Sequence, residues 1–383
     1  MEIYLDNSAT TKQYDEVSEK MFEAMKDCYG NPSSLHRKGL EAEKLVKEAR
    51  RNVASLIGAS DDEIHFTSCA TESNNTVFFG LAEAKKKQGK RIITTKIEHP
   101  SILEPAKKLE QMGFDVKYLD VDKDCKVKLD QLKEYLNDET ILISVMLVNN
   151  ETGAIQPLQE IARIRDGFNR AIPLHCDAVQ GLGKVDCNLV GVNLMSGSAH
   201  KLHGPKGMGM LYADKGFNLK PYILGGGQER GFRSGTENLP GIVGFGLASK
   251  IAKERQRDNL EKMAKVKDYL LNGLCTELDD ILINSPKDGC PSILNVSFLG
   301  TRGEVILHTL EQDGIFVSTG SACSSNKNQK GSHVLDAMGL SFKEIEGAIR
   351  FSFNEFNTVQ EMDFVIDRTV NAVKRFRKLG TFR

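Results

Sequence analysis

The chain has 383 residues, of which 40% are hydrophobic and 27% charged, the balance of an ordinary globular protein. Its formal net charge of −1, from 51 Lys and Arg against 52 Asp and Glu, predicts no direct binding to nucleic acid or an anionic membrane. There is no run of ~18 apolar residues and no signal peptide at the N-terminus, which predicts a cytoplasmic protein without a membrane span.

The first predicted elements are a strand-like segment at residues 1–6 and an amphipathic helix over residues 41–57. Short β-rich runs follow at residues 64–67, 91–95, 116–119, 141–148, 172–176 and 194–197. Helical patterns separate several of them, at residues 72–87, 101–112, 129–137 and 158–168. Ser101 with Glu104 resembles a capping box at the start of one of these helices. The alternation predicts an α/β fold with a mostly parallel sheet covered by helices on both faces.

Residues 240–278 read as a long helix with a charged middle, a bridge to a second domain. The C-terminal part contains predicted strands at residues 293–298, 315–318 and 348–353, which suit a smaller α+β domain.

Eight cysteines are scattered along the chain without CxxC spacing, so we expect free thiols and no metal site.

Chemically active residues follow three of the predicted strands, where open α/β sheets place their sites. Residues 68–72 open a helix with small and hydroxyl side chains, a pattern that suits phosphate. Asp177 ends a buried strand, where it either meets a cation or caps the next turn. Lys201 follows the next strand, between His200 and a glycine-containing segment. A lysine, a buried acid and a phosphate cradle are the parts that pyridoxal phosphate requires.

Three segments carry a resemblance to a known family: residues 198–207 (SAHKLHGPKG), 233–238 (RSGTEN) and 320–323 (GSAC). In this order they resemble the cysteine desulfurases of the class V aminotransferase superfamily, and the likeness runs from residues 4–11 (YLDNSATT) to 349–352 (IRFS). The resemblance implies fold type I of the pyridoxal-phosphate enzymes. A large domain, residues 15–255, holds a mostly parallel seven-stranded sheet. Residues 1–14 and 256–383 form the smaller domain, which carries the cysteine loop.

The resemblance also implies roles for single residues around the cofactor ring. Lys201 forms the Schiff base with pyridoxal phosphate, and Asp177 keeps the pyridine nitrogen protonated. His99, in EHPS at residues 98–101, stacks on the ring and is a candidate to move a proton. Gln180 bonds the phenolic oxygen.

The phosphate is then held by Ala70, Thr71, Ser198 and His200, joined by Thr236 from the partner subunit of a homodimer.

For the substrate, the resemblance implies that Asn150 and Arg350 anchor the carboxylate, with Asn150 also beside the cofactor. A guanidinium fork suits a carboxylate, although a strand-end salt bridge is the alternative for Arg350. Asn31 and Arg233 are expected to line the same region.

Cys323 lies in a small, polar stretch of residues 317–333 that reads as a loop, an unusual place for a free cysteine. It is either the nucleophile that receives the substrate's sulfur or a small residue tucked under the loop. The predicted reaction turns L-cysteine into alanine and a persulfide on Cys323, for transfer to an iron–sulfur scaffold or a tRNA-thiolation enzyme. A selenocysteine lyase or another enzyme of the same fold is the alternative.

Overall fold

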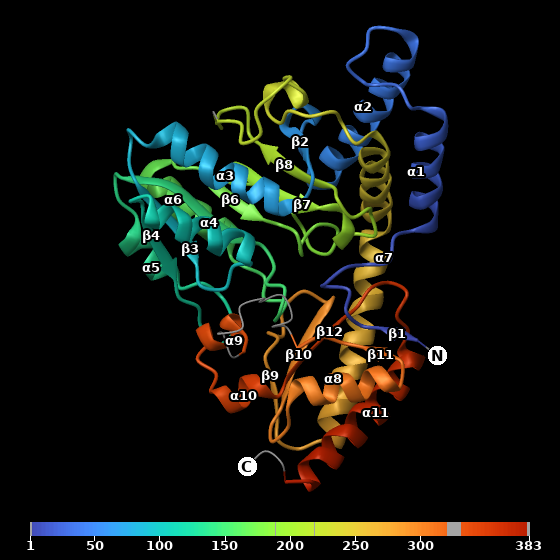
Figure 1. Cartoon of the computed structure of the whole chain (residues 1–383). Helices are drawn as coiled ribbons and strands as arrows, with labels where there is room; N and C mark the ends of the chain where they lie inside the picture. The colour runs from blue at the N-terminus through green and yellow to red at the C-terminus, as the bar shows by residue number, and fades with distance from the viewer. Residues whose placement is uncertain (1, 188, 218, 320–330, 381–383) are drawn as a thin grey trace.

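The computed structural model describes residues 2–187, 189–217, 219–319 and 331–380, and Figure 1 shows their arrangement. The helices are α1 (Asp15–Asp27), α2 (Arg37–Ile57), α3 (Ala70–Lys85), α4 (Pro100–Gln111), α5 (Leu129–Tyr135), α6 (Leu158–Asn169), α7 (Leu239–Glu277), α8 (Gly303–Gln312), α9 (His333–Ala337), α10 (Phe342–Glu346) and α11 (Val359–Lys378). The strands are β1 (Ile3–Tyr4), β2 (Ile64–Thr67), β3 (Arg91–Thr95), β4 (Asp115–Leu119), β5 (Thr140–Met146), β6 (Leu174–Asp177), β7 (Leu194–Ser198), β8 (Gly209–Ala213), β9 (Ile281–Ile283), β10 (Ile293–Phe298), β11 (Ile315–Phe316) and β12 (Ala348–Ser352).

Seven strands form the main sheet, in the order β2-β8-β7-β6-β5-β3-β4. The pairs from β4 to β7 are parallel, and β8 runs antiparallel to β7 and β2. The predicted mostly parallel α/β sheet is therefore confirmed. Every residue of the central strand β5 is buried, as its nearly continuous apolar sequence predicts.

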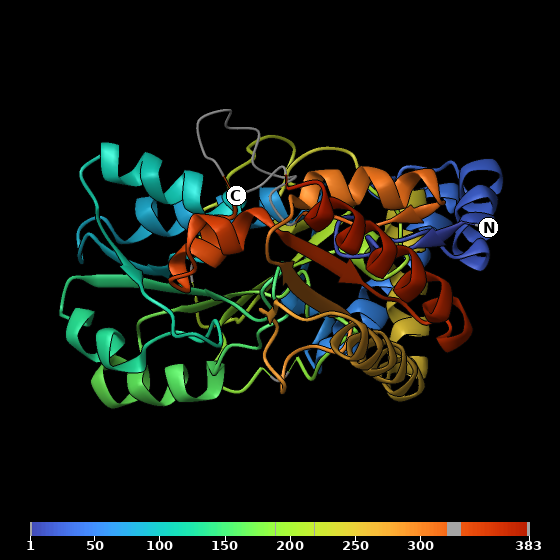
Figure 2. The ribbon, with the colours of Figure 1, turned by 90° about the horizontal axis from the view of Figure 1, so that it is seen from below.

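Helices cover both faces of this sheet. Viewed from below in Figure 2, α3 and α4 lie on one side and α5 and α6 on the other. Their apolar residues pack on the strands because helical spacing collects them on one face; in α4, Ile102, Ala106 and Leu109 are fully buried.

A smaller sheet, β12-β10-β9, is antiparallel and packs with α8 and α11 around a second core. The N-terminal strand β1 pairs with β11 among these C-terminal elements, as the blue strand at the lower right of Figure 1 shows. The long helix α7 connects the two parts. Its buried residues belong to the large core up to Ala252 and to the small core from Met263 onward. The domain division near residue 255 stays a prediction.

Seven of these elements were not predicted individually from the sequence: the helices α1, α8, α9, α10 and α11 and the strands β8 and β9. Among the described residues, none of the helices is apolar for long enough to cross a membrane.

Candidate active site

A cavity of about 260 Å³ lies where β6 and β7 end, at the carboxyl edge of the main sheet. It is lined by Ser8, Ala9, Cys69, Ala70, Thr71, His99, Ser101, Met146, Val148, Asn150, Asp177, Val179, Gln180, Ser198, His200, Lys201 and Arg350. The structure thus brings together ten of the residues predicted for the site, from segments that lie up to 280 positions apart in the chain (350 − 70).

Lys201 ends the short turn that follows β7 and is only partly exposed. Its ammonium donates to the carbonyl oxygens of Ser8 (2.5 Å) and Ala9 (2.8 Å). The N-terminal segment therefore holds the amine at the cavity wall, where it can meet an aldehyde.

Asp177 is 5% exposed and uses both carboxylate oxygens. Oδ1 accepts from the backbone N–H of Val179 (3.0 Å). This bond caps the turn, which was one of the two roles that the sequence allowed for Asp177. Oδ2 accepts from Nδ2 of Asn74 on α3 (2.9 Å), and Asn74 is held in turn by the hydroxyl of Ser101 (2.9 Å). The carboxylate is thereby fixed at the cavity, so its capping bond and a functional role are compatible.

His99 is the N-cap of α4, and its Nδ1 accepts from the backbone N–H of Ser101 (3.1 Å). The predicted capping box of Ser101 and Glu104 is therefore wrong, because the helix begins one residue earlier, at Pro100, which has no N–H to satisfy. Burial lowers the pKa of His99, with Lys201 acting in the same direction against Asp177. The ring is neutral at physiological pH and carries its hydrogen on Nε2.

Four of the residues predicted to hold the phosphate line the cavity: Ala70 and Thr71 from the first turn of α3, and Ser198 and His200 from the end of β7 and the turn after it. Cys69, the N-cap of α3, makes no side-chain capping bond. Among the described residues, the first backbone hydrogen bond of this helix is donated by Ser73, to Cys69 (3.2 Å), which leaves the earlier N–H groups for a ligand. Burial lowers the pKa of His200 to about 4, so a neutral imidazole lies beside this turn.

Gln180 and Arg350 line the cavity and form hydrogen bonds to the N-terminal segment. Gln180 donates to the carbonyl oxygen of Ser8 (2.8 Å), while its Oε1 has no partner among the described residues. Arg350 donates to Oδ1 of Asp6 (2.7 Å) and to the carbonyl oxygen of Asn150 (3.0 Å). The salt bridge considered for Arg350 is present, yet its guanidinium still lines the cavity.

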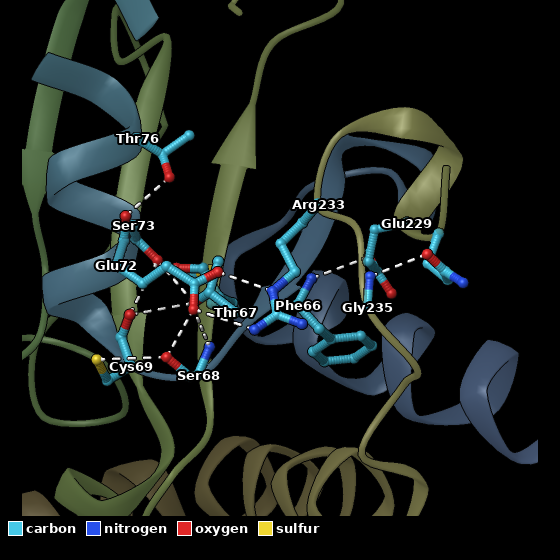
Figure 3. Close-up of polar contacts among 12 residues, drawn as sticks. Phe66, Thr67, Ser68, Cys69, Glu72, Ser73, Thr76, Glu229, Arg233 and Gly235 are labelled. Carbon is cyan, nitrogen blue, oxygen red and sulfur yellow. Dashed lines mark hydrogen bonds and ion pairs between the residues drawn. The ribbon is translucent and has the colours of Figure 1, made fainter. Parts of the chain in front are cut away.

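Three predicted site residues do not line this cavity: Asn31, Arg233 and Thr236. Asn31 is exposed and accepts from the N–H of Ser33 (2.9 Å). Arg233 pairs with Glu72 (Nε–Oε1 2.9 Å), as Figure 3 shows. Thr236 is exposed on the same loop.

Cys323 lies outside the described residues, but the chain on either side of its segment is anchored beside the cavity. Ser318 forms a two-way backbone bridge with Arg350 (3.1 and 2.7 Å). On the other side, Nε2 of His333 contacts the carbonyl oxygen of Glu98 (3.0 Å), the neighbour of His99.

The sequence reasoning missed several residues of the site. Ser8 and Ala9 belong to the N-terminal motif at residues 4–11, which contributed to the family resemblance. The motif did not reveal that the carbonyl groups of Ser8 and Ala9 bind Lys201. Glu98 is fully buried, and burial raises the pKa of its carboxyl group to about 8. Oε1 accepts from Thr95 (2.9 Å) and from the N–H of Met146 (2.9 Å), so Glu98 ties two strand ends together behind His99.

The residues present fit pyridoxal phosphate. The lining of the cavity includes the amine of Lys201, the buried carboxylate of Asp177 and the N-terminus of α3, whose N-cap residue makes no side-chain capping bond. Two buried acceptors at its edge, Oγ of Ser8 and Oε1 of Gln180, have no partner among the described residues, which suits polar groups of a bound molecule.

Comparisons with known proteins show the family to which this chain belongs. The family model for class-V aminotransferases matches residues 3–365. A cysteine desulfurase IscS from Dictyoglomus turgidum is 41% identical over 385 residues, which cover 100% of this chain and 97% of that relative. A solved NifS-like protein superposes with a TM-score of 0.92 at 42% identity, over 98% of this chain and 100% of its own. A structure of SspA in complex with cysteine gives 0.80 at 34% identity, over 92% and 98%. These matches confirm the resemblance, and the chain belongs to the class-V aminotransferase family.

Proposed function

We propose that this protein is a cysteine desulfurase that uses pyridoxal phosphate to take the sulfur from L-cysteine, releasing alanine and leaving a persulfide on Cys323. The observation that carries the proposal is the gathering of Lys201, Asp177, His99 and Arg350 around one cavity, with Ser318 and His333 anchored beside it. These two residues flank the segment that contains Cys323 in the sequence, which supports a thiol that reaches the bound substrate. The relatives' names add support, because they are cysteine desulfurases rather than selenocysteine lyases.

The substrate carboxylate is bound by Arg350, with Asn150 beside it. Arg350 is 3% exposed and its Nε has no partner among the described residues, so a buried donor remains for a carboxylate. Arg350 also donates to the Asn150 carbonyl oxygen, which fixes the two residues relative to each other.

Lys201 and Asp177 act on two different protons, one on the substrate Cα and one on the ring nitrogen of the cofactor. When bound, pyridoxal phosphate supplies an electron sink for the electron pair released at the substrate Cα. Lys201 would take the Cα proton, and Asp177 would hold the cofactor by its ring nitrogen and keep that nitrogen protonated. Asn74 and the Val179 N–H keep the Asp177 carboxylate in place for that role.

Cys323 is the residue that receives the sulfur. Its thiolate attacks the substrate sulfur, forming an S–S bond while the C–S bond breaks and its electron pair stays with the carbon. His99 enters neutral, because burial lowers its pKa, and its Nε2–H is the group that can donate a proton during this transfer. A proton returned to the carbon skeleton then completes alanine.

The persulfide is passed to an acceptor protein, either an iron–sulfur scaffold or a tRNA-thiolation enzyme. We place the enzyme in the cytoplasm, as a homodimer without nucleic acid or membrane partners. The dimer brings Thr236 of one subunit to the phosphate of the other, which accounts for an exposed threonine on a loop outside its own cavity.

The proposal is tested by incubating purified protein with L-cysteine and dithiothreitol and measuring alanine and sulfide together. Equal amounts of both are expected. Alanine without sulfide, or pyruvate in its place, would move the assignment to another reaction on this fold; strong preference for selenocysteine would favour the lyase.

Replacing Asp177 by asparagine is expected to leave the cofactor bound but to slow removal of the Cα proton by about 10²-fold, because the ring nitrogen loses its proton. Stopped-flow absorption after mixing with L-cysteine measures this step. A normal rate would leave Asp177 only its structural bonds to Val179 and Asn74.

Replacing Thr236 by alanine is expected to weaken cofactor binding by about tenfold, the loss of one hydrogen bond to a charged group, while light scattering still gives a dimer. A fully active monomer would contradict the shared site.

A further inference from the structure

Glu72 presents an electrostatic conflict beside the turn that is predicted to bind the phosphate. It is the third residue of α3 and directly follows Thr71, which lines the cavity. A carboxylate in the first turn of a helix stabilises the helix itself. The same negative charge repels a phosphate bound at the same turn, and it does so strongly because the Glu72 side chain is only 9% exposed.

The Glu72 carboxylate is fully engaged, as Figure 3 shows. Arg233 donates from Nε to Oε1 (2.9 Å) and from Nη2 to Oε2 (3.3 Å). Ser68 donates to Oε2 from its backbone N–H (3.0 Å) and its hydroxyl (2.6 Å). Burial alone raises the pKa of Glu72, but the bonds from Arg233 and Ser68 outweigh it, and the pKa is lowered. The carboxylate is therefore ionised and needs a counter-charge.

The loop that carries Arg233 is held in place by contacts that do not involve Glu72. The backbone N–H of Ser234 donates to the carbonyl oxygen of Ile223 (3.2 Å) and joins the two ends of the loop. Earlier in the same loop, Glu229 forms a buried bidentate ion pair with Arg50 (2.7 and 2.7 Å) and accepts from the N–H of Phe66 on β2 (3.0 Å). The loop would stay attached to the sheet after loss of the Arg233 guanidinium alone.

We propose that Arg233 is a positioning residue for the cofactor phosphate: it neutralises Glu72, so that the N-terminus of α3 can hold a dianion. This replaces the expected contact of Arg233 with substrate and rests on the proposed function. Ser68, fixed by Glu72, keeps the turn before Ala70 and Thr71 in the binding geometry. The loop that carries Arg233 also carries Thr236, so one segment serves the phosphate of its own subunit and that of its neighbour.

The experiment measures the dissociation constant of pyridoxal phosphate from apoprotein by absorption titration. Arg233→Met is expected to raise it about tenfold, since an uncompensated carboxylate then faces the phosphate. Pyridoxal, which lacks the phosphate, should bind the variant as it binds the wild type. Glu72→Gln combined with Arg233→Met should restore most of the affinity, because the repelling charge is gone.

Arg230→Met is the matched control. Arg230 is exposed on the same loop and donates to the carbonyl oxygen of Asp62 (2.7 Å), so its loss removes an equal charge without uncovering Glu72. Pyridoxal phosphate affinity should not change. Equal weakening of pyridoxal and pyridoxal phosphate, or no recovery in the double variant, would overturn the inference. Wild-type protein that binds pyridoxal phosphate but yields no alanine from cysteine would refute the proposed function and leave this readout intact.

Discussion

Replacing Lys201 by alanine is expected to remove the covalent attachment of the cofactor and to reduce turnover by at least about 10⁴-fold, because the amine that takes the Cα proton is lost. Lys201 is the lysine that lines the wall beside Asp177, held there by the carbonyl oxygens of Ser8 and Ala9. Borohydride reduction of the wild type, followed by peptide mapping, should place the cofactor on Lys201.

Lys206 provides the control for this substitution. It lies five residues later in the same glycine-containing segment and is exposed. Lys206→Ala should keep the cofactor absorption and most of the activity. A reduced cofactor found on Lys206, or on any lysine other than Lys201, would refute the assignment.

Replacing Cys323 by serine is expected to separate the two halves of the reaction. Cofactor chemistry with L-cysteine should continue, because Lys201, Asp177 and His99 are unchanged. Alanine release should fall by at least about 10²-fold, since a hydroxyl cannot form a persulfide with the substrate sulfur. The measurement is alanine release with dithiothreitol as acceptor, alongside the absorption change on mixing with substrate.

Cys275→Ser is the matched control, because Cys275 is an exposed free thiol at the far end of α7. It should retain full activity. Cys176, by contrast, is completely buried at the end of β6, and burial raises its pKa well above the usual value, so it cannot substitute for Cys323. Full alanine production by Cys323→Ser would remove Cys323 from the mechanism and favour a lyase that expels sulfur directly.

The sequence predicted the sheet well where strands are short runs of β-branched and apolar residues. The bounds of β2, β3 and β10 agree with the predicted ranges. The strand β8 was missed because GMLYA has no alternation and directly follows a glycine-rich turn. The helix α1 was missed although Val17, Met21 and Ala24 recur at helical spacing, so the signal for it is present in the sequence.

The candidate site could be predicted where a motif carries its own chemistry, as around Lys201 and Asp177. Contacts between distant segments could not be predicted. The bond from Arg350 to Asp6 spans 344 residues and that from Arg233 to Glu72 spans 161, and no local pattern reveals either. Arg233 was therefore expected at the substrate, whereas the structure pairs its guanidinium with Glu72.

The central claim, that the sulfur of L-cysteine passes to Cys323, is tested most directly by peptide mass spectrometry. The protein is mixed with L-cysteine in the absence of reductant, alkylated and digested. We predict that the peptide containing Cys323 gains the mass of one sulfur atom in the wild type but not in Lys201→Ala. A peptide without added sulfur, from wild-type enzyme that has released alanine, would contradict the account.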